Sequence, residues 1–142
     1  MNNKIVIFIS GRGSNAKNII NYFSDNSDFQ VSHVFSNNKH SDFANRIKKT
    51  NVKYFLFKED EINGKVFNEL KKIKPKLIIL AGFLKKIPPL YINFFKNKII
   101  NIHPSLLPKY GGEGMYGLNI HKKVIENEEA ETGISIHYVS EE

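Results

Sequence analysis

Short apolar runs and amphipathic stripes take turns along the chain. The runs are rich in Ile, Val, Leu and Phe, which is typical of strands covered on both faces. They occupy residues 4–10, 31–36, 52–57, 76–83, 98–103 and 132–139. Apolar residues at helical spacing, or helix-start signals such as Pro-Pro, predict helices near residues 16–23, 41–49, 66–73, 88–95 and 117–127. This alternation predicts an α/β fold, a doubly wound, mostly parallel, Rossmann-like sheet with helices on both faces.

Ligands of such a sheet bind beyond the carboxyl ends of its strands, and three segments there carry candidate chemistry. The first is the turn SGRGSN after the first strand. Gly11 and Gly13 allow a sharp turn with exposed backbone N–H groups, and we expect Ser14 and Asn15 to cap the helix that follows. Ala16 stands where a dinucleotide fingerprint has its third glycine, so one phosphate monoester fits better than a dinucleotide. An ordinary strand-to-helix turn is the alternative.

The second segment is AGFLKKI, which leaves the fourth predicted strand. Ala81 and Gly82 allow close approach to the backbone, and the neighbouring apolar residues are expected to form a wall: Phe83, Leu84 and Ile87. The combination suits a flat heteroaromatic ring, although simple turn packing explains the same residues.

The third segment is NIHPSLLPKY, at the end of the fifth predicted strand. Asn101 and His103 are two positions apart on an extended chain, so they point the same way and are predicted to share one pocket. A carboxamide donor beside a titratable imidazole could stabilise an oxyanion and move a proton. The other histidines are expected to be packed or solvated, with His137 against a helix: His33, His40, His121 and His137.

Composition and charge narrow the classes of partner. The chain has 142 residues, 41% of them hydrophobic, which fits one globular domain. It has no cysteine, which excludes thiolate metal ligands and fits a cytoplasmic setting. The net charge of +7 comes almost wholly from scattered lysines, so we expect no nucleic-acid or membrane partner but attraction for an anionic small molecule.

The three motifs, in this order and at this spacing, closely resemble those of the glycinamide ribonucleotide formyltransferase family, and the likeness extends over residues 4–142. The resemblance implies a folate-dependent transferase of purine biosynthesis and one-carbon metabolism. Such an enzyme transfers a formyl group from 10-formyltetrahydrofolate, its co-substrate, to the amine of glycinamide ribonucleotide. It implies no metal, and a monomer or homodimer.

The resemblance also assigns roles to residues. The substrate phosphate falls to the glycine turn: Gly11, Gly13, Ser14 and Asn15. The folate falls to the loop after the fourth strand and two further residues: Leu84, Lys85, Lys86, Ile87, Asn101 and Lys65. The catalytic residues are Asn101, which donates to the oxygen of the tetrahedral intermediate, and His103, which stabilises its charge and helps to move protons. The bond Leu107–Pro108 is a candidate for the cis form that the family often has.

Two departures from the family change the expectations. The segment GGEGMYGLNIH (residues 111–121) replaces a shorter loop, and its glycines imply a mobile flap. The family's third catalytic residue, an aspartate, has no counterpart, because neither Glu141 nor Glu142 matches it. We therefore expect residues 1–142 to be a single formyltransferase domain, truncated at its C-terminal end, with little or no activity alone.

Two other functions fit part of the pattern. A methionyl-tRNA formyltransferase-like enzyme shares the Asn-x-His and SLLP features, but it has no small phosphate to hold and thus no need of the glycine turn. A non-catalytic phosphate- or folate-binding fragment would bind without turnover.

Overall fold

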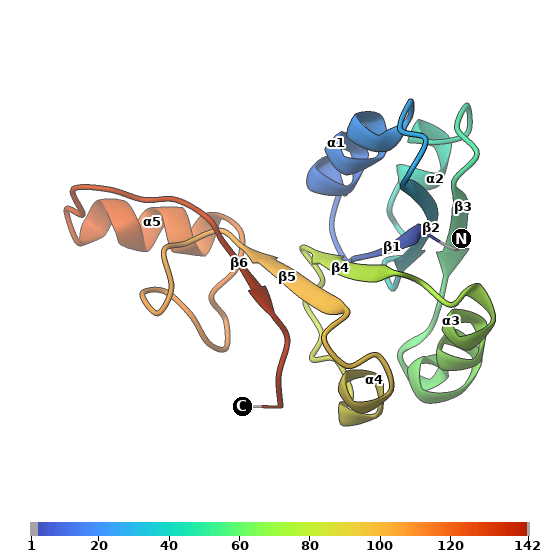
Figure 1. The fold of residues 1–142 in the computed structure, drawn as a ribbon. Coiled ribbons are helices and arrows are strands. Elements are labelled where there is room, and N and C mark those ends of the chain that lie inside the picture. The colour runs from blue at the N-terminus through green and yellow to red at the C-terminus, as the bar shows by residue number, and fades with distance from the viewer. Residues whose placement is uncertain (1–2, 142) are drawn as a thin grey trace.

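A six-stranded sheet forms the middle layer of the molecule (Figure 1). The computed structural model describes residues 3–141. The strands are β1 (Lys4–Ile9), β2 (Gln30–Ser36), β3 (Lys53–Leu56), β4 (Leu77–Ala81), β5 (Ile99–His103) and β6 (Ser135–Tyr138). They lie in the order β3-β2-β1-β4-β5-β6. The first five are parallel and β6 is antiparallel to β5, which confirms the predicted doubly wound, mostly parallel sheet.

Helices cover both faces of the sheet. They are α1 (Ser14–Phe23), α2 (Phe43–Arg46), α3 (Phe67–Ile73), α4 (Pro89–Phe94) and α5 (Leu118–Glu126). In Figure 1, α1 and α2 lie on one side of β1 and β4, while α3 and α4 lie on the other. A 3₁₀ turn, Glu59–Glu61, and a π-helical turn, Ile62–Val66, precede α3. Among the helices described for residues 3–141, none has the length and hydropathy of a membrane span.

The second helix is shorter than predicted. The stripe at residues 41–49 predicts two turns, but α2 ends after four residues. Thr50 explains the end, because its backbone N–H and its hydroxyl both donate to the carbonyl of Ile47, at 2.9 and 2.6 Å. A side chain that captures a backbone carbonyl in this way competes with helix propagation.

The sheet separates two apolar cores. β1 is buried on both faces, so its alternate residues enter different cores. Phe8 stacks on Phe35 with ring centroids 5.2 Å apart and meets Phe83 edge-on at 5.4 Å. Tyr91, fully buried in the same core, donates its hydroxyl to the carbonyl of Ile62 in the π-helical turn, and burial raises the pKa of that hydroxyl. The cores fix β1 and β4, whose carboxyl ends carry the predicted motifs.

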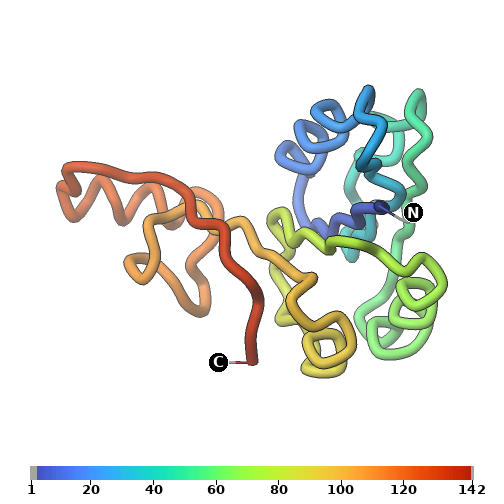
Figure 2. The backbone as a smooth tube through the Cα atoms, in the orientation of Figure 1, coloured from blue at the N-terminus to red at the C-terminus, as the bar shows by residue number. Residues whose placement is uncertain are grey.

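The segment that follows β5 extends away from these cores. The tube in Figure 2 shows β6, α5 and the loop before α5 to one side of the remaining elements. The apolar side chains of Ile136 and Tyr138 on β6 are 61% and 65% exposed. β6 is an edge strand of the described sheet, so its outer side has no strand partner there.

Candidate active site

The register of the sheet brings the ends of three strands to one level. Phe8 of β1 pairs with Leu80 of β4, and Leu80 pairs with Asn101 of β5. Two residues further along each strand, Ser10 and His103 therefore stand at the same height on the carboxyl edge. Only β4 lies between their strands, which corresponds to a separation of about 10 Å.

Ser10 joins the first two motifs directly. Its backbone N–H donates to the carbonyl of Gly82 at 3.2 Å. Its hydroxyl accepts a hydrogen bond from the N–H of Leu84 at 3.0 Å. The glycine turn and the loop after β4 are thus held together at the edge where Asn101 and His103 end their strand.

At one position of the glycine turn, Gly13, the backbone has a conformation that only glycine adopts easily. Gly13 has φ of +74°, and a Cβ on it would lie 2.5 Å from Cδ2 of Phe43. The first intrahelical bond of α1 runs from the N–H of Lys17 to the carbonyl of Gly13, at 2.8 Å. The N–H groups of Ser14 and Asn15 precede it, so they have no acceptor within the helix. The turn therefore offers backbone donors and the positive end of a helix dipole to an anion.

The expected side-chain caps of this helix are not found. The N-cap of α1 is Gly13, and no side chain makes a capping hydrogen bond there. Ser14 and Asn15 lie inside the first turn instead, with exposed side chains. Gly11 is exposed as well, and nothing lies within 4 Å of a Cβ built on it. The prediction that Ser14 or Asn15 caps the helix is wrong, which leaves their side chains available to a ligand.

Asn101 and His103 are half-buried on one side of β5. Ile100 and Ile102, which alternate with them along β5, pack toward the opposite core, as the alternation of a strand requires. His103 places Nε2 2.8 Å from the carbonyl oxygen of Tyr110. A carbonyl only accepts, so Nε2 carries the hydrogen and Nδ1 is the basic nitrogen of the neutral ring.

His137 fixes the carboxamide of Asn101. The two are opposite each other in the β5–β6 pair, with Nδ2 of Asn101 3.2 Å from Nε2 of His137. The other ring nitrogen, Nδ1, lies 3.1 Å from the carbonyl oxygen of Tyr138 and so carries the hydrogen. Nε2 is then the acceptor, and the amide nitrogen of Asn101 faces it. The prediction that His137 packs against a helix is wrong, because it is exposed and contacts Asn101.

The loop after β4 differs in part from the predicted apolar wall. The side chain of Ile87 is only 3% exposed and belongs to the core, whereas Leu84 is 54% exposed. Nζ of Lys85 lies 3.3 Å from a carboxylate oxygen of Glu59, and Lys86 is exposed. Leu84 and the two lysines are therefore at the surface, and Ile87 can meet a ligand through its backbone alone.

Lys65 lies apart from the other candidate residues. Its Nζ is 3.8 Å from a carboxylate oxygen of Glu61 and 5.3 Å from the ring centroid of Phe55. Phe55 is on β3, the edge strand opposite to the β5–β6 edge. The structure therefore does not bring Lys65 together with Asn101.

The loop after β5 is held by hydroxyl groups and contains the expected cis bond. The Leu107–Pro108 peptide is cis, as predicted. Ser105 donates its hydroxyl to the carbonyl of Lys109 at 2.7 Å. Ser135 of β6 donates to the carbonyl of Ser105 at 2.7 Å and accepts from the N–H of Leu107 at 3.0 Å.

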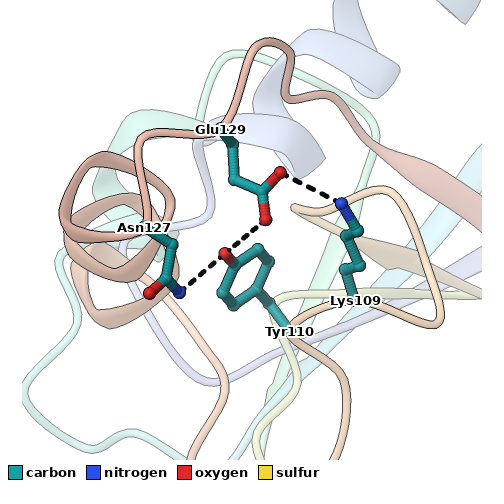
Figure 3. A network of polar contacts seen from close by, with 4 residues as sticks. All are labelled: Lys109, Tyr110, Asn127 and Glu129. Carbon is teal, nitrogen blue, oxygen red and sulfur yellow. Dashed lines mark hydrogen bonds and ion pairs between the residues drawn. The ribbon is translucent and has the colours of Figure 1, made fainter.

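A polar network lies between this loop and the end of α5 (Figure 3). The Lys109 ammonium is 3.0 Å from Oε2 of Glu129, and the Tyr110 hydroxyl donates to Oε1 at 2.8 Å. Asn127 donates in turn to the Tyr110 hydroxyl at 2.9 Å. The hydrogen bond from Lys109 lowers the pKa of Glu129. The same hydrogen bond raises the pKa of Lys109. The backbone carbonyl of Tyr110 accepts the hydrogen bond from His103. The network therefore holds in place the residue that orients the imidazole.

A hollow of about 190 Å³ lies beside the network. Its lining is the loop from Ser105 to Tyr110 and the residues Val124, Glu129, Glu131 and Thr132. Neither Asn101 nor His103 lines it, so this hollow is not the pocket predicted for the pair, and their sharing of a pocket stays a prediction. Asn101 and His103 lie in the C-terminal half of β5, toward the carboxyl edge of the sheet.

Sequence reasoning missed three residues that organise this edge: Ser10, Tyr110 and His137. Ser10 and Tyr110 act through a hydroxyl or a backbone carbonyl, and no periodicity points to such contacts. His137 could have been found by treating the last strand as antiparallel to β5, since that pairing sets histidine against asparagine.

The described residues offer few alternatives for ligand chemistry. In the range 3–141 there is no group of three or more His, Asp or Glu side chains that could hold a metal ion. Glu141 accepts a hydrogen bond from Asn93 at 3.0 Å. Glu142, which like Glu141 was expected not to match the family's aspartate, lies outside the described residues.

Comparison with known proteins agrees with this geometry. The family model described as formyl transferase matches residues 3–142. A chloroplastic phosphoribosylglycinamide formyltransferase of Arabidopsis thaliana is 35% identical over 147 residues, which cover 98% of this chain and 50% of the relative. The phosphoribosylglycinamide formyltransferase of Escherichia coli K12 is 31% identical over 145 residues, covering 97% of this chain and 66% of the relative.

Solved structures give the same result. The crystal structure of glycinamide ribonucleotide transformylase 1 from Geobacillus kaustophilus superposes with a TM-score of 0.86 at 27% identity, covering 100% of this chain and 77% of that one. The chain thus spans between half and two thirds of the length of the two curated relatives. With the motifs placed at one edge of the same fold, and a family match over nearly every residue, the chain belongs to the formyl transferase family.

Proposed function

We propose that this chain carries the reaction centre of a phosphoribosylglycinamide formyltransferase. The reaction transfers a formyl group from 10-formyltetrahydrofolate to the amine of glycinamide ribonucleotide, in purine biosynthesis and in a cytoplasmic setting. The observation that carries the proposal is the common level of Ser10, Gly82 and His103, which gathers an anion turn, a ligand loop and a catalytic pair at one edge. The names of the relatives support the choice of substrate.

The glycine turn suits the phosphate of the nucleotide. The backbone N–H groups of Ser14 and Asn15 and their exposed side chains supply several donors to one anion. Gly13 allows the turn to keep the conformation that presents them, since its φ of +74° is costly for any other residue. A dinucleotide is a poorer fit, because Ser36 and Asn37 stand where an acidic residue would bind a ribose.

The folate co-substrate suits the loop after β4. Its backbone around Leu84 is anchored by Ser10, and Lys85 and Lys86 are exposed beside it. Lysine side chains can attract the acidic tail of a folate, and exposed Leu84 can cover a ring. Lys65 remains a proposed contact only for a distant part of the ligand, because it lies against β3.

Asn101 and His103 suit the chemistry of formyl transfer. Addition of the amine to the formyl carbon places negative charge on the formyl oxygen, and the Asn101 amide can donate to that oxygen. The bond to Tyr110 keeps Nδ1 of His103 available to accept the proton that the amine loses. The same proton can then pass to the folate nitrogen as its bond to the formyl carbon breaks.

Ligand binding and transfer assays test the proposal together. The chain should bind glycinamide ribonucleotide, and any formyl transfer should go to this acceptor rather than to methionyl-tRNA. In a full-length chain, Asn101→Ala and His103→Ala should remove most of the turnover, by about 10²–10³-fold for a lost donor, while the nucleotide still binds. Preferential formylation of methionyl-tRNA, or absence of nucleotide binding, would contradict it. The expected weakness of turnover by this chain alone stays a prediction that the same assay measures.

A further inference from the structure

Helix α2 lies directly behind the glycine turn and contacts its backbone. Arg46 donates from Nη1 to the carbonyl oxygen of Arg12, within the turn. The guanidinium carbon lies 5.7 Å from the ring centroid of Phe43, which is fully buried. Lys17 of α1 donates from Nζ to the carbonyl of Arg46 at 3.1 Å. Two helices and the turn are thus joined through one arginine.

This contact controls the direction of a backbone donor. In a trans peptide the carbonyl oxygen and the next N–H point in opposite directions. The oxygen of Arg12 is directed to the guanidinium of Arg46, so the N–H of Gly13 points away from it. Phe43 fills the space beside Gly13, where a Cβ would lie 2.5 Å from its ring, and so limits rotation of this peptide.

The contact also removes an unfavourable group from an anion site. A carbonyl oxygen turned toward a phosphate would repel it, whereas a guanidinium that holds this oxygen withdraws it and leaves a positive charge nearby. Arginine is suited to this role, because its fork keeps further N–H donors after one is used.

We propose that Arg46 is a positioning residue for a phosphate ester bound by the glycine turn. It acts by holding the Arg12 carbonyl and thereby aiming the Gly13 N–H. The inference rests on the proposed function for the identity of the anion, but the effect of Arg46 on the turn does not need a ligand to be observed.

Lys49, an exposed lysine that follows α2, provides a matched control for the charge of Arg46. Lys49 is exposed and has no hydrogen bond or ion pair among the described residues. Lys49→Met therefore removes the same charge near the same surface as Arg46→Met, without a change at the Arg12 carbonyl. Arg46→Lys keeps the charge and one donor but not the fork, and methionine keeps apolar contact with Phe43.

The experiment compares the full chain with these three variants by two readouts. Amide resonances of ¹⁵N-labelled protein report the Gly13 N–H without ligand, and titration with glycinamide ribonucleotide at fixed ionic strength gives the dissociation constant. We expect Arg46→Met to move the Gly13 resonance and to weaken binding about 10-fold, as for a lost charge-assisted hydrogen bond. Lys49→Met should leave the resonance in place and change binding by less than about 2-fold. Arg46→Lys should fall between wild type and Arg46→Met.

The outcomes separate the inference from the proposed function. If the wild-type chain does not bind the nucleotide, the proposed function fails, and the Gly13 resonance alone then decides whether Arg46 aims the turn. If Arg46→Met binds as wild type does, the inference is overturned whatever the resonance shows. It is also overturned if Arg46→Met and Lys49→Met weaken binding equally with no change at Gly13, because charge alone then explains the loss.

Discussion

Asn101 and His137 face each other across β5 and β6, with the carboxamide Nδ2 3.2 Å from the imidazole Nε2. The tautomer is set by the carbonyl of Tyr138, so the imidazole accepts and the amide donates. One N–H of Asn101 is used in this way. The second is left to a ligand in an orientation that the histidine determines.

His137→Leu should disorient the Asn101 amide without affecting the phosphate site. In a full-length chain we expect formyl transfer to fall about 10-fold, a part of the 10²–10³-fold that a lost oxyanion donor costs, with unchanged nucleotide affinity. His137→Gln should recover part of the rate, because its amide oxygen can also accept from Asn101.

The side-chain ¹⁵N resonances of Asn101 provide a readout for this variant that needs no turnover. They should shift in His137→Leu and stay in place in the control His121→Leu, which changes an exposed histidine of α5. If the Asn101 side-chain resonances shift in neither variant, His137 does not orient the carboxamide.

Gly13→Ala should destabilise the fold, while Gly11→Ala should not. An alanine at φ of +74° costs about 1–2 kcal/mol, and its Cβ would also displace Phe43, only 2.5 Å away. A Cβ on Gly11 meets nothing within 4 Å. Denaturant unfolding of the two variants checks this difference, and equal midpoints would show that the turn is less constrained than described.

Ser10→Ala should loosen the loop after β4 more than the glycine turn. The substitution removes the acceptor of the Leu84 N–H but keeps the backbone bond from Ser10 to Gly82. Amide hydrogen exchange at Leu84 should therefore become faster, and folate affinity should fall by about 3-fold, in line with a net hydrogen bond of 0.5–1.5 kcal/mol. Unchanged exchange at Leu84 would mean that the serine does not hold the loop.

The network around Glu129 predicts a response to acid. Its pKa is lowered from 4.5 by the hydrogen bonds from Lys109 and Tyr110. A carboxyl with a lowered folded pKa contributes stability that is present above its unfolded pKa and is lost as the pH falls through the folded pKa. The resonances of Tyr110 should therefore shift with a midpoint below 4.5.

Glu129→Gln is the control for this response, since its amide does not titrate. The Tyr110 resonances of that variant should show no such acid midpoint. A midpoint that remains in Glu129→Gln would assign the response to another group.

The strands and most helix positions follow from the sequence because burial on both faces leaves a continuous apolar run. Residues 4–10 and 76–83 predict β1 and β4 within two residues. The length of α2 was not predictable from its stripe, because Thr50 ends it through side-chain and backbone hydrogen bonds to Ile47.

The site was predictable as a set of motifs but not as a set of contacts. The positions of the glycine turn and of Asn101 and His103 follow from where strands end. The contacts of His137 and Arg46 depend on which elements become neighbours in space, and single-chain periodicity does not contain that information. Lys65, which the resemblance assigned to the folate, lies in the π-helical turn and packs over Phe55. The sequence did not indicate this contact either.

The central claim is that the glycine turn and Asn101 belong to one binding site for glycinamide ribonucleotide. Titration of the ¹⁵N-labelled chain with this nucleotide tests it most directly. The account predicts that the amides of Gly11, Gly13, Ser14 and Asn15 shift together with the side-chain amide of Asn101, all with one dissociation constant. Shifts confined to one of the two places, or none at either, would contradict it.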